Sequence, residues 1–147
     1  TYLETEIGNF ILDVLYTAKP MEYTEPKTAE MLTKHAVELA VVESNNGGRG
    51  FARNVEKQAR LMGNNKTRIK FHQSQNKAVR IFTHSAEVQN LTYFPRGWAQ
   101  MWPDFYQALT HYMKVGKNAH DDAPDALTGT VEQRPITGKK SAAGYFA

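Results

Sequence analysis

The feature that most constrains the fold of this chain is an alternation of short strand-like runs with longer amphipathic segments. The apolar run Val37 to Glu43 is too short for a buried helix, and a glycine-rich turn follows it directly. That combination is typical of a strand leading into a helix. Helical periodicity resumes over residues 50–62, with apolar side chains at helical spacing and basic ones opposite them. The pattern predicts an α/β fold.

The remaining segments extend this alternation. Further helices are expected over 28–35, 77–89, from Pro103 to near Gly116, and over 122–132; strands are expected within 1–17, joined by a two-residue turn at Gly8-Asn9, and over 68–71 and 91–94. Strands separated by amphipathic helices favour a mixed sheet flanked by helices over a helical bundle. We expect one domain over 1–132 and a flexible tail over 133–147, where Pro, Gly, Lys and Ser dominate.

Composition narrows the functional classes. The 147 residues are 41% hydrophobic, which suits one globular domain, and a net charge of +3 with a pI near 9.1 favours a polyanionic partner. Because cysteine is absent, disulfides, thiolate zinc sites and cysteine nucleophiles are excluded. No apolar run approaches the roughly 20 residues that span a bilayer, so no membrane partner is expected. The chain opens without methionine on a strand-like pattern, and we expect a fragment of a larger protein.

Two groups of acids carry the strongest chemical signal. Asp121, Asp122 and Asp125 gather with His120 around a predicted helix start, and Glu43 closes the apolar strand. Carboxylates from a strand end and a helix start, brought together by folding, are what a hard divalent cation needs. Two Mg²⁺ or Mn²⁺ ions about 4 Å apart can then activate a water and stabilise a leaving oxygen. The pattern predicts a metal-dependent phosphodiester enzyme.

Helix capping is the simpler alternative for some of these acids. Asp122 is a good N-cap residue, and Asp125, three positions later, complements the helix dipole. Capping explains neither the third acid with His120 nor a glutamate at the end of a buried strand. From the residues alone, both interpretations stay open.

Basic residues suggest how DNA would be held. The segment from Asn45 to Gly50 could cradle phosphate at the start of the next helix, assisted by Arg49 and Arg53, and Lys77 and Arg80 follow on a later helix. An ordinary turn and a solvated helix face are the alternatives. The chain has no phosphate-binding loop of the nucleotide-hydrolysing type.

Three segments, in this order, resemble a known family: Val41-Val42-Glu43-Ser44-Asn45-Asn46-Gly47-Gly48, Asn76-Lys77-Ala78-Val79-Arg80-Ile81 and His120-Asp121-Asp122-Ala123-Pro124-Asp125-Ala126-Leu127. They look like the C-terminal nuclease domain of terminase large subunits from tailed phages and prophages, from about Phe10 to Val131. The resemblance implies an RNase H-like fold that cuts concatemeric viral DNA during genome packaging with two divalent metals. It also implies double-stranded DNA, an upstream ATPase domain, the portal and the small terminase subunit as partners, in the cytoplasm of the bacterial host.

By this resemblance Glu43 is the acid on the central strand and Asp122 the metal ligand at the last helix. Asp121 would be a neighbouring ligand or orienting group, and Asp125 and His120 would support the ligands or join them. The family carries a further aspartate on a leading strand that this chain lacks. Asp13 is the upstream acid that could face the site, with a structural or exposed role as the alternative.

Two other functions remain open at this point. One is a DNA-binding or motor-docking module whose catalytic centre is incomplete. The other is a different RNase H-like nuclease, such as a resolvase or transposase core. Metal-dependent cleavage separates the first of these from an enzyme.

Overall fold

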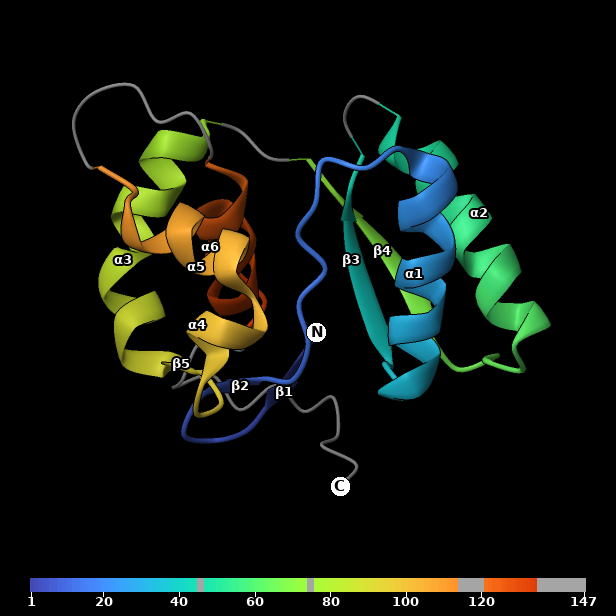
Figure 1. The fold of residues 1–147 in the computed structure, drawn as a ribbon, viewed down its shortest axis with the longest axis horizontal. Coiled ribbons are helices and arrows are strands. Elements are labelled where there is room, and N and C mark those ends of the chain that lie inside the picture. Colours follow the sequence, from blue (N-terminus) through green and yellow to red (C-terminus); the bar gives the residue numbers. More distant parts are fainter. Residues whose placement is uncertain (45–46, 74–75, 114–120, 135–147) are drawn as a thin grey trace, which may run out of the picture.

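The computed structural model describes residues 1–44, 47–73, 76–113 and 121–134 (Figure 1). Its elements are β1 (Tyr2–Glu4), β2 (Asn9–Ile11), α1 (Met21–Lys34), β3 (Leu39–Glu43), α2 (Gly48–Leu61), β4 (Arg68–His72), α3 (Lys77–Leu91), β5 (Thr92–Tyr93), α4 (Trp98–Met101), α5 (Pro103–Thr110) and α6 (Asp122–Glu132). The expected mixed α/β class is confirmed.

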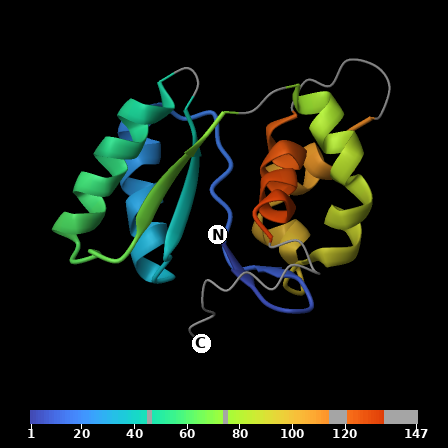
Figure 2. The ribbon, with the colours of Figure 1, turned by 180° about the vertical axis from the view of Figure 1, so that it is seen from behind.

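The elements fall into two groups that both views separate (Figures 1 and 2). One group holds α1 and α2 beside strands β3 and β4, and the other holds α3 to α6 with β1, β2 and β5. The extended segment 12–20, blue in both views, runs between them. The strands therefore form two sheets, ordered β1-β2-β5 and β3-β4, where the sequence pattern predicted one.

The first group is built around a β-α-β unit. Strands β3 and β4 run parallel, in a register that pairs Leu39 with Arg68 at one end and Glu43 with His72 at the other. One face of this sheet packs on α1 and α2 through a core of small and branched side chains, namely Ala29, Leu32, Val55 and Ala59, with Ala40 packed against it. On α2 the buried residues Ala52, Val55 and Ala59 are spaced i, i+3 and i+7, which places them on one face of the helix.

The second group encloses a separate core. Buried Ile11, Phe105, Ala123 and Leu127 form its centre. Aromatic rings pack around them, with Phe94 stacked on Trp98 at a centroid distance of 4.0 Å. This core joins β2 to α5 and α6, so the start of α6 is anchored by Ala123 and Leu127.

Two local expectations were wrong. Helix α1 begins at Met21 and contains Pro26, whereas we expected a helix only over 28–35. Pro26 removes one intrahelical hydrogen bond, but burial of Ala29 and Leu32 against α2 stabilises the helix in spite of that loss.

The N-terminal hairpin also differs from the expected two-residue turn. Glu4 pairs with Asn9, so the loop spans residues 5–8 and Asn9 belongs to β2. The Asn9 side chain is fully buried, donates to the Thr130 carbonyl (3.2 Å) and accepts from Arg134 (2.7 Å). A Cβ at Gly8 would lie 2.5 Å from the Leu91 carbonyl oxygen, so only glycine fits there. These tertiary contacts, rather than turn propensity, determine the hairpin.

Helix α6 ends at Glu132, and the described residues continue to Arg134. Arg134 is described and donates to the carbonyl oxygen of Thr5 at 2.9 Å, while residues 135–147 of the expected tail lie outside the described residues. Helix α5 ends at Thr110, and α4 was not expected. Within the described part of the chain, no helix is long and apolar enough to cross a membrane.

Candidate functional site

Glu43 is the last residue of β3, at the carboxyl end of the parallel sheet. The chain then turns sharply into α2, where a Cβ at Gly48 would lie 1.8 Å from the Glu43 carbonyl oxygen. Gly47, the N-cap of α2, has a φ of 91°, in the left-handed region that favours glycine. The two glycines therefore bring the first turn of α2 directly against Glu43.

The acids of the second motif lie in the first turn of α6. Asp121 is the N-cap residue, and Asp122 and Asp125 are helical. Pro124 sits in this first turn, where a missing backbone N–H costs nothing. The Asp121 side chain makes no capping hydrogen bond, and Asp122 lies one position too late to be the cap. The capping interpretation of Asp122 is therefore wrong.

Lys77, at the start of α3, faces these two acids. Its Nζ donates to Asp122 Oδ1 at 2.7 Å and lies 3.6 Å from Asp121 Oδ1. The hydrogen bond with Asp122 raises the pKa of Lys77. Because Asp122 is largely exposed, this pair stays accessible to solvent and to other cations.

Arg80, one turn further along α3, makes a more enclosed set of bonds. Its Nη1 donates to Asp125 at 2.7 Å, and Nε and Nη2 donate to the two oxygens of Glu132 at 2.9 and 2.6 Å. The side chains of Arg80, Asp125 and Glu132 are only 15%, 12% and 18% exposed. Arg80 thus joins the start and the end of α6 to α3.

Burial and charge act differently on the carboxyl groups of Asp125 and Glu132. Hydrogen bonding from Arg80 lowers the pKa of Glu132. Burial raises the pKa of Asp125; Arg80 and Lys77 oppose that effect, and the charge of Glu43 adds to it. The hydrogen bond with Glu132 raises the pKa of Arg80, and the charge of Glu43 adds to that effect. The end of β3 and the start of α6 therefore share one electrostatic environment, although about 80 residues separate them in sequence.

Three residues of this environment escaped the sequence analysis. They are Glu132, His84, whose Nε2 lies 3.6 Å from Glu132, and His72, the cross-strand neighbour of Glu43. Glu132 lies seven residues after Asp125, two helical turns along the same face, which is a detectable signal. His72 Nε2 is buried and has no hydrogen-bond partner among the described residues. The sequence shows that His72 follows a second predicted strand, but it does not show that Glu43 is the cross-strand neighbour of His72.

The other predicted site residues lie elsewhere. Asp13 contacts α1, accepting from Lys34 at 3.0 Å and lying 3.1 Å from His35 Nε2. Burial alone would raise the pKa of Asp13, but the hydrogen bonds of His35 and Lys34 lower it. This is the structural role that we considered as the alternative. His120 lies outside the described residues.

The two predicted DNA-binding arginines of α2 do not contact the acids of α6 in any described interaction. The Arg49 guanidinium lies over the Phe71 ring, 4.8 Å from its centroid. Arg53 is exposed one turn further on. Helix α2, which carries both residues, lies in the half of the molecule opposite α3 (Figures 1 and 2).

The residues fit a divalent cation in part. Carboxylate oxygens are the donors that Mg²⁺ and Mn²⁺ prefer, and the Asp121 and Asp122 oxygens already converge on one cationic atom, Lys77 Nζ. However, the described residues contain no group of three or more His, Asp or Glu side chains arranged to hold a metal. The donor chemistry and two carboxylates fit, and a third ligand is not assembled among the described residues.

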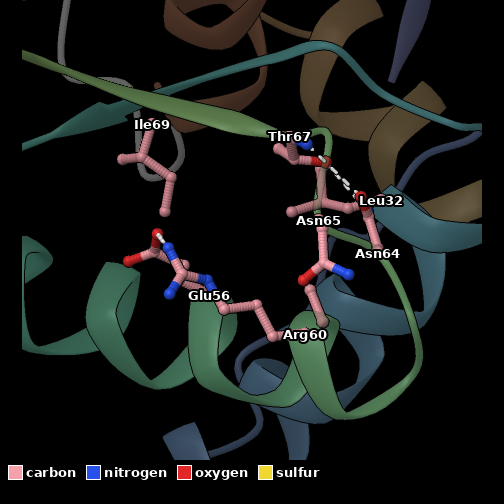
Figure 3. A pocket seen from close by; sticks show the side chains of 8 residues that line it. Leu32, Glu56, Arg60, Asn64, Asn65, Thr67 and Ile69 are labelled. Carbon is pink, nitrogen blue, oxygen red and sulfur yellow. Dashed lines mark hydrogen bonds and ion pairs between the residues drawn. The ribbon is translucent and has the colours of Figure 1, made fainter.

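A small hollow lies away from this site, between the end of α2 and the start of β4 (Figure 3). Its volume is about 30 Å³, and the Glu56–Arg60 ion pair lines it. A water needs roughly 10–15 Å³ of such space, so the hollow has room for about two waters and cannot hold a nucleotide or metabolite.

Comparison of the chain with protein-family models, curated proteins and solved structures finds no match. The resemblance to terminase nuclease domains therefore depends on the three motifs alone.

Proposed function

We propose that this chain is a metal-dependent endonuclease domain that cuts double-stranded DNA, of the kind found in terminase large subunits. An RNase H-like arrangement, use of Mg²⁺ or Mn²⁺ and a role in packaging viral DNA belong to the same proposal. The observation that carries it is the convergence of the Asp121 and Asp122 carboxylates on one cationic atom, Lys77 Nζ, at 3.6 and 2.7 Å. The charge of Glu43, at the end of β3, also acts on the carboxyl of Asp125. This effect supports the expected meeting of the two acid motifs.

Each residue has a defined part in this proposal. Glu43 and Asp122 would hold the cation, with Asp121 beside them. Arg80 holds Asp125 and Glu132 and so keeps the first turn of α6 facing α3. Bound divalent ions would supply an activated water and stabilise charge on the leaving oxygen. The buried core residues Ala123 and Leu127 keep the acid-bearing turn in place.

Plasmid nicking in Mn²⁺ tests the proposal. Glu43→Gln or Asp122→Asn should abolish nicking and leave the thermal melt nearly unchanged. Glu38→Gln, an exposed acid just before β3, is the matched control and should cut like the wild type. Normal nicking by Glu43→Gln would overturn the proposal.

The second candidate is a DNA-binding module without a working catalytic centre. The pairing of Asp122 with Lys77 and of Asp125 with Arg80 favours it, because these acids are already neutralised by protein cations. It predicts DNA binding without cleavage in any metal. The same nicking assay, run beside a binding assay, separates the two candidates.

A further inference from the structure

Helix α2 has an unbalanced charge distribution. Residues 48–61 contain four basic side chains, Arg49, Arg53, Lys57 and Arg60, and a single acid, Glu56. Arg60 forms an ion pair with Glu56 at 2.6 Å. Within the described residues, Arg49, Arg53 and Lys57 make no ion pair. Pairs of opposite charge at i,i+3 or i,i+4 stabilise an exposed helix, and Lys27 and Glu30 form such a pair at i,i+3 in α1.

The three unbalanced residues lie on one face. Arg49, Arg53 and Lys57 are spaced by four, so they follow one another along the helix, and all three are exposed. The buried positions Ala52, Val55 and Ala59 point to the core on another face. From Arg49 to Lys57 the row extends about 12 Å at roughly 1.5 Å per residue. We name this row the α2 basic row.

Helix energetics alone does not explain the row. The N-terminal turn of α2 carries the positive end of the helix dipole, which disfavours a cation there, and it contains Arg49 and no acid. Stacking on Phe71 holds the Arg49 guanidinium in place. The result is a concentration of positive charge beside Glu43, since Gly48 packs against the Glu43 carbonyl.

We infer that the α2 basic row is the surface that holds the DNA backbone, in preference to Lys77 and Arg80 of α3. Charge complementarity selects DNA as the partner, because its phosphates are negative and the row is positive. The row also matches DNA in length, since about 12 Å spans three to four base-pair steps of about 3.4 Å. Helix α2, which carries the row, begins five residues after Glu43 and lies in the half of the molecule opposite α3 (Figures 1 and 2). On α3, Lys77 and Arg80 are already paired with acids. The choice of DNA rests on the proposed function.

Binding of a mixed-sequence 20-base-pair duplex, measured in EDTA over a range of salt concentrations, tests this inference. The triple variant Arg49→Gln, Arg53→Gln, Lys57→Gln should bind at least tenfold more weakly at low salt. The slope of its log K plotted against log salt concentration should become shallower by up to about 2.7 units, about 0.9 for each lost phosphate contact. A second duplex of unrelated sequence should give the same result, because backbone contacts carry no base information.

The matched control is Lys19→Gln, Lys27→Gln, Lys34→Gln, which removes the same charge from α1 and the segment before it. This variant should keep most of the wild-type salt slope. Equal slopes in the α2 variant and the wild type, with both chains folded by thermal melt, would overturn the inference. Equal flattening in both triple variants would also overturn it, because net charge alone would then explain binding.

The nicking assay keeps the two proposals separate. Wild-type binding through α2 without metal-dependent nicking would refute the nuclease and leave the inference standing. Nicking that depends on Glu43, with an unchanged salt slope in the α2 variant, would support the nuclease and refute the inference about the α2 basic row.

Discussion

The two helix pairs of this molecule are joined by different chemistry. Helices α1 and α2 meet through buried Ala29, Leu32, Val55 and Ala59 beside the β3–β4 sheet. Helices α3 and α6 meet along a row of ion pairs centred on Arg80, in addition to the packing of Val88 against the core that contains Ala123 and Leu127. The apolar contact depends on volume, whereas the ionic contact depends on charge, pH and neighbouring cations.

This difference teaches where function can be expected. An ionic contact can exchange its partners, because a metal ion or a phosphate competes for the same groups, and an apolar core has no such freedom. Two of the predicted metal ligands, Asp121 and Asp122, belong to the ionic contact. The four predictions below test how far the two contacts differ.

The largest expected effect is on the apolar contact. Leu32→Ala removes a side chain that is 7% exposed, and it should lower the free energy of unfolding by about 2–5 kcal/mol. The cost should be the same at low and high salt in urea unfolding. Leu61→Ala, at a position 80% exposed, is the control and should change it by less than about 0.5 kcal/mol. A strongly salt-dependent cost for Leu32→Ala would break the comparison.

Next is the centre of the ionic contact. Arg80→Met leaves the carboxylates of Asp125 and Glu132 largely buried without their cation, so stability should fall by about 3 kcal/mol. Urea unfolding measures this loss. Arg60→Met, which breaks the exposed pair with Glu56, should cost less than about 1 kcal/mol. Similar costs for the two arginines would show that Arg80 is no more than a surface residue.

The third prediction concerns pH. The pKa of Glu132 is lowered in the folded state, so its ionisation stabilises the fold above its unfolded pKa of about 4.3, and this stability is lost as pH falls through the folded pKa. Glu132→Gln should therefore cost about 1–2 kcal/mol at pH 7 and less in acid. The pKa of Asp125 is raised, so its ionisation disfavours folding at neutral pH.

Asp125→Asn is the matched variant for this test. It should cost less than Glu132→Gln at pH 7, and its cost should grow as pH falls toward 4, the opposite trend. Urea unfolding at pH 4, 5 and 7 compares the two. Parallel pH profiles would contradict the assignment of the two carboxyls.

The smallest effect on stability is expected at Lys77. Lys77→Met breaks a partly exposed pair and should change stability by less than about 1 kcal/mol. Because the ammonium and a metal ion would compete for Asp121 and Asp122, Mn²⁺ should bind about threefold to tenfold more tightly, or roughly 0.7–1.4 kcal/mol. Calorimetric titration with Mn²⁺ measures this, and Lys27→Met on α1 is the control. An unchanged Mn²⁺ affinity in Lys77→Met would show that the lysine does not occupy the cation position.

Local signals predicted much of the fold. Helix α6 occupies its expected range, and Glu43 ends its strand as expected. Helix α3 and strand β4 each end one or two residues beyond their own expected ranges. These elements have strong periodicity or clear end signals, which act within one or two turns of chain. Glu43, the three aspartates of α6, Lys77 and Arg80 could also be named from sequence, since residue type and position near an element end suffice for that. Glu132, His72 and His84 were missed.

The tertiary structure alone decided how these residues are paired. Lys77 and Asp122, and Arg80 and Asp125, lie 45 residues apart, and their contact depends on how α3 and α6 dock. Docking also placed Asn9 in a buried strand, divided the strands into two sheets, and directed Asp13 to α1. A sequence therefore determines which charges a segment carries and roughly where its helices and strands begin and end. Whether a charge meets solvent, an acid or a ligand depends on distances across the fold, because electrostatic and packing energies follow separation in space rather than along the chain.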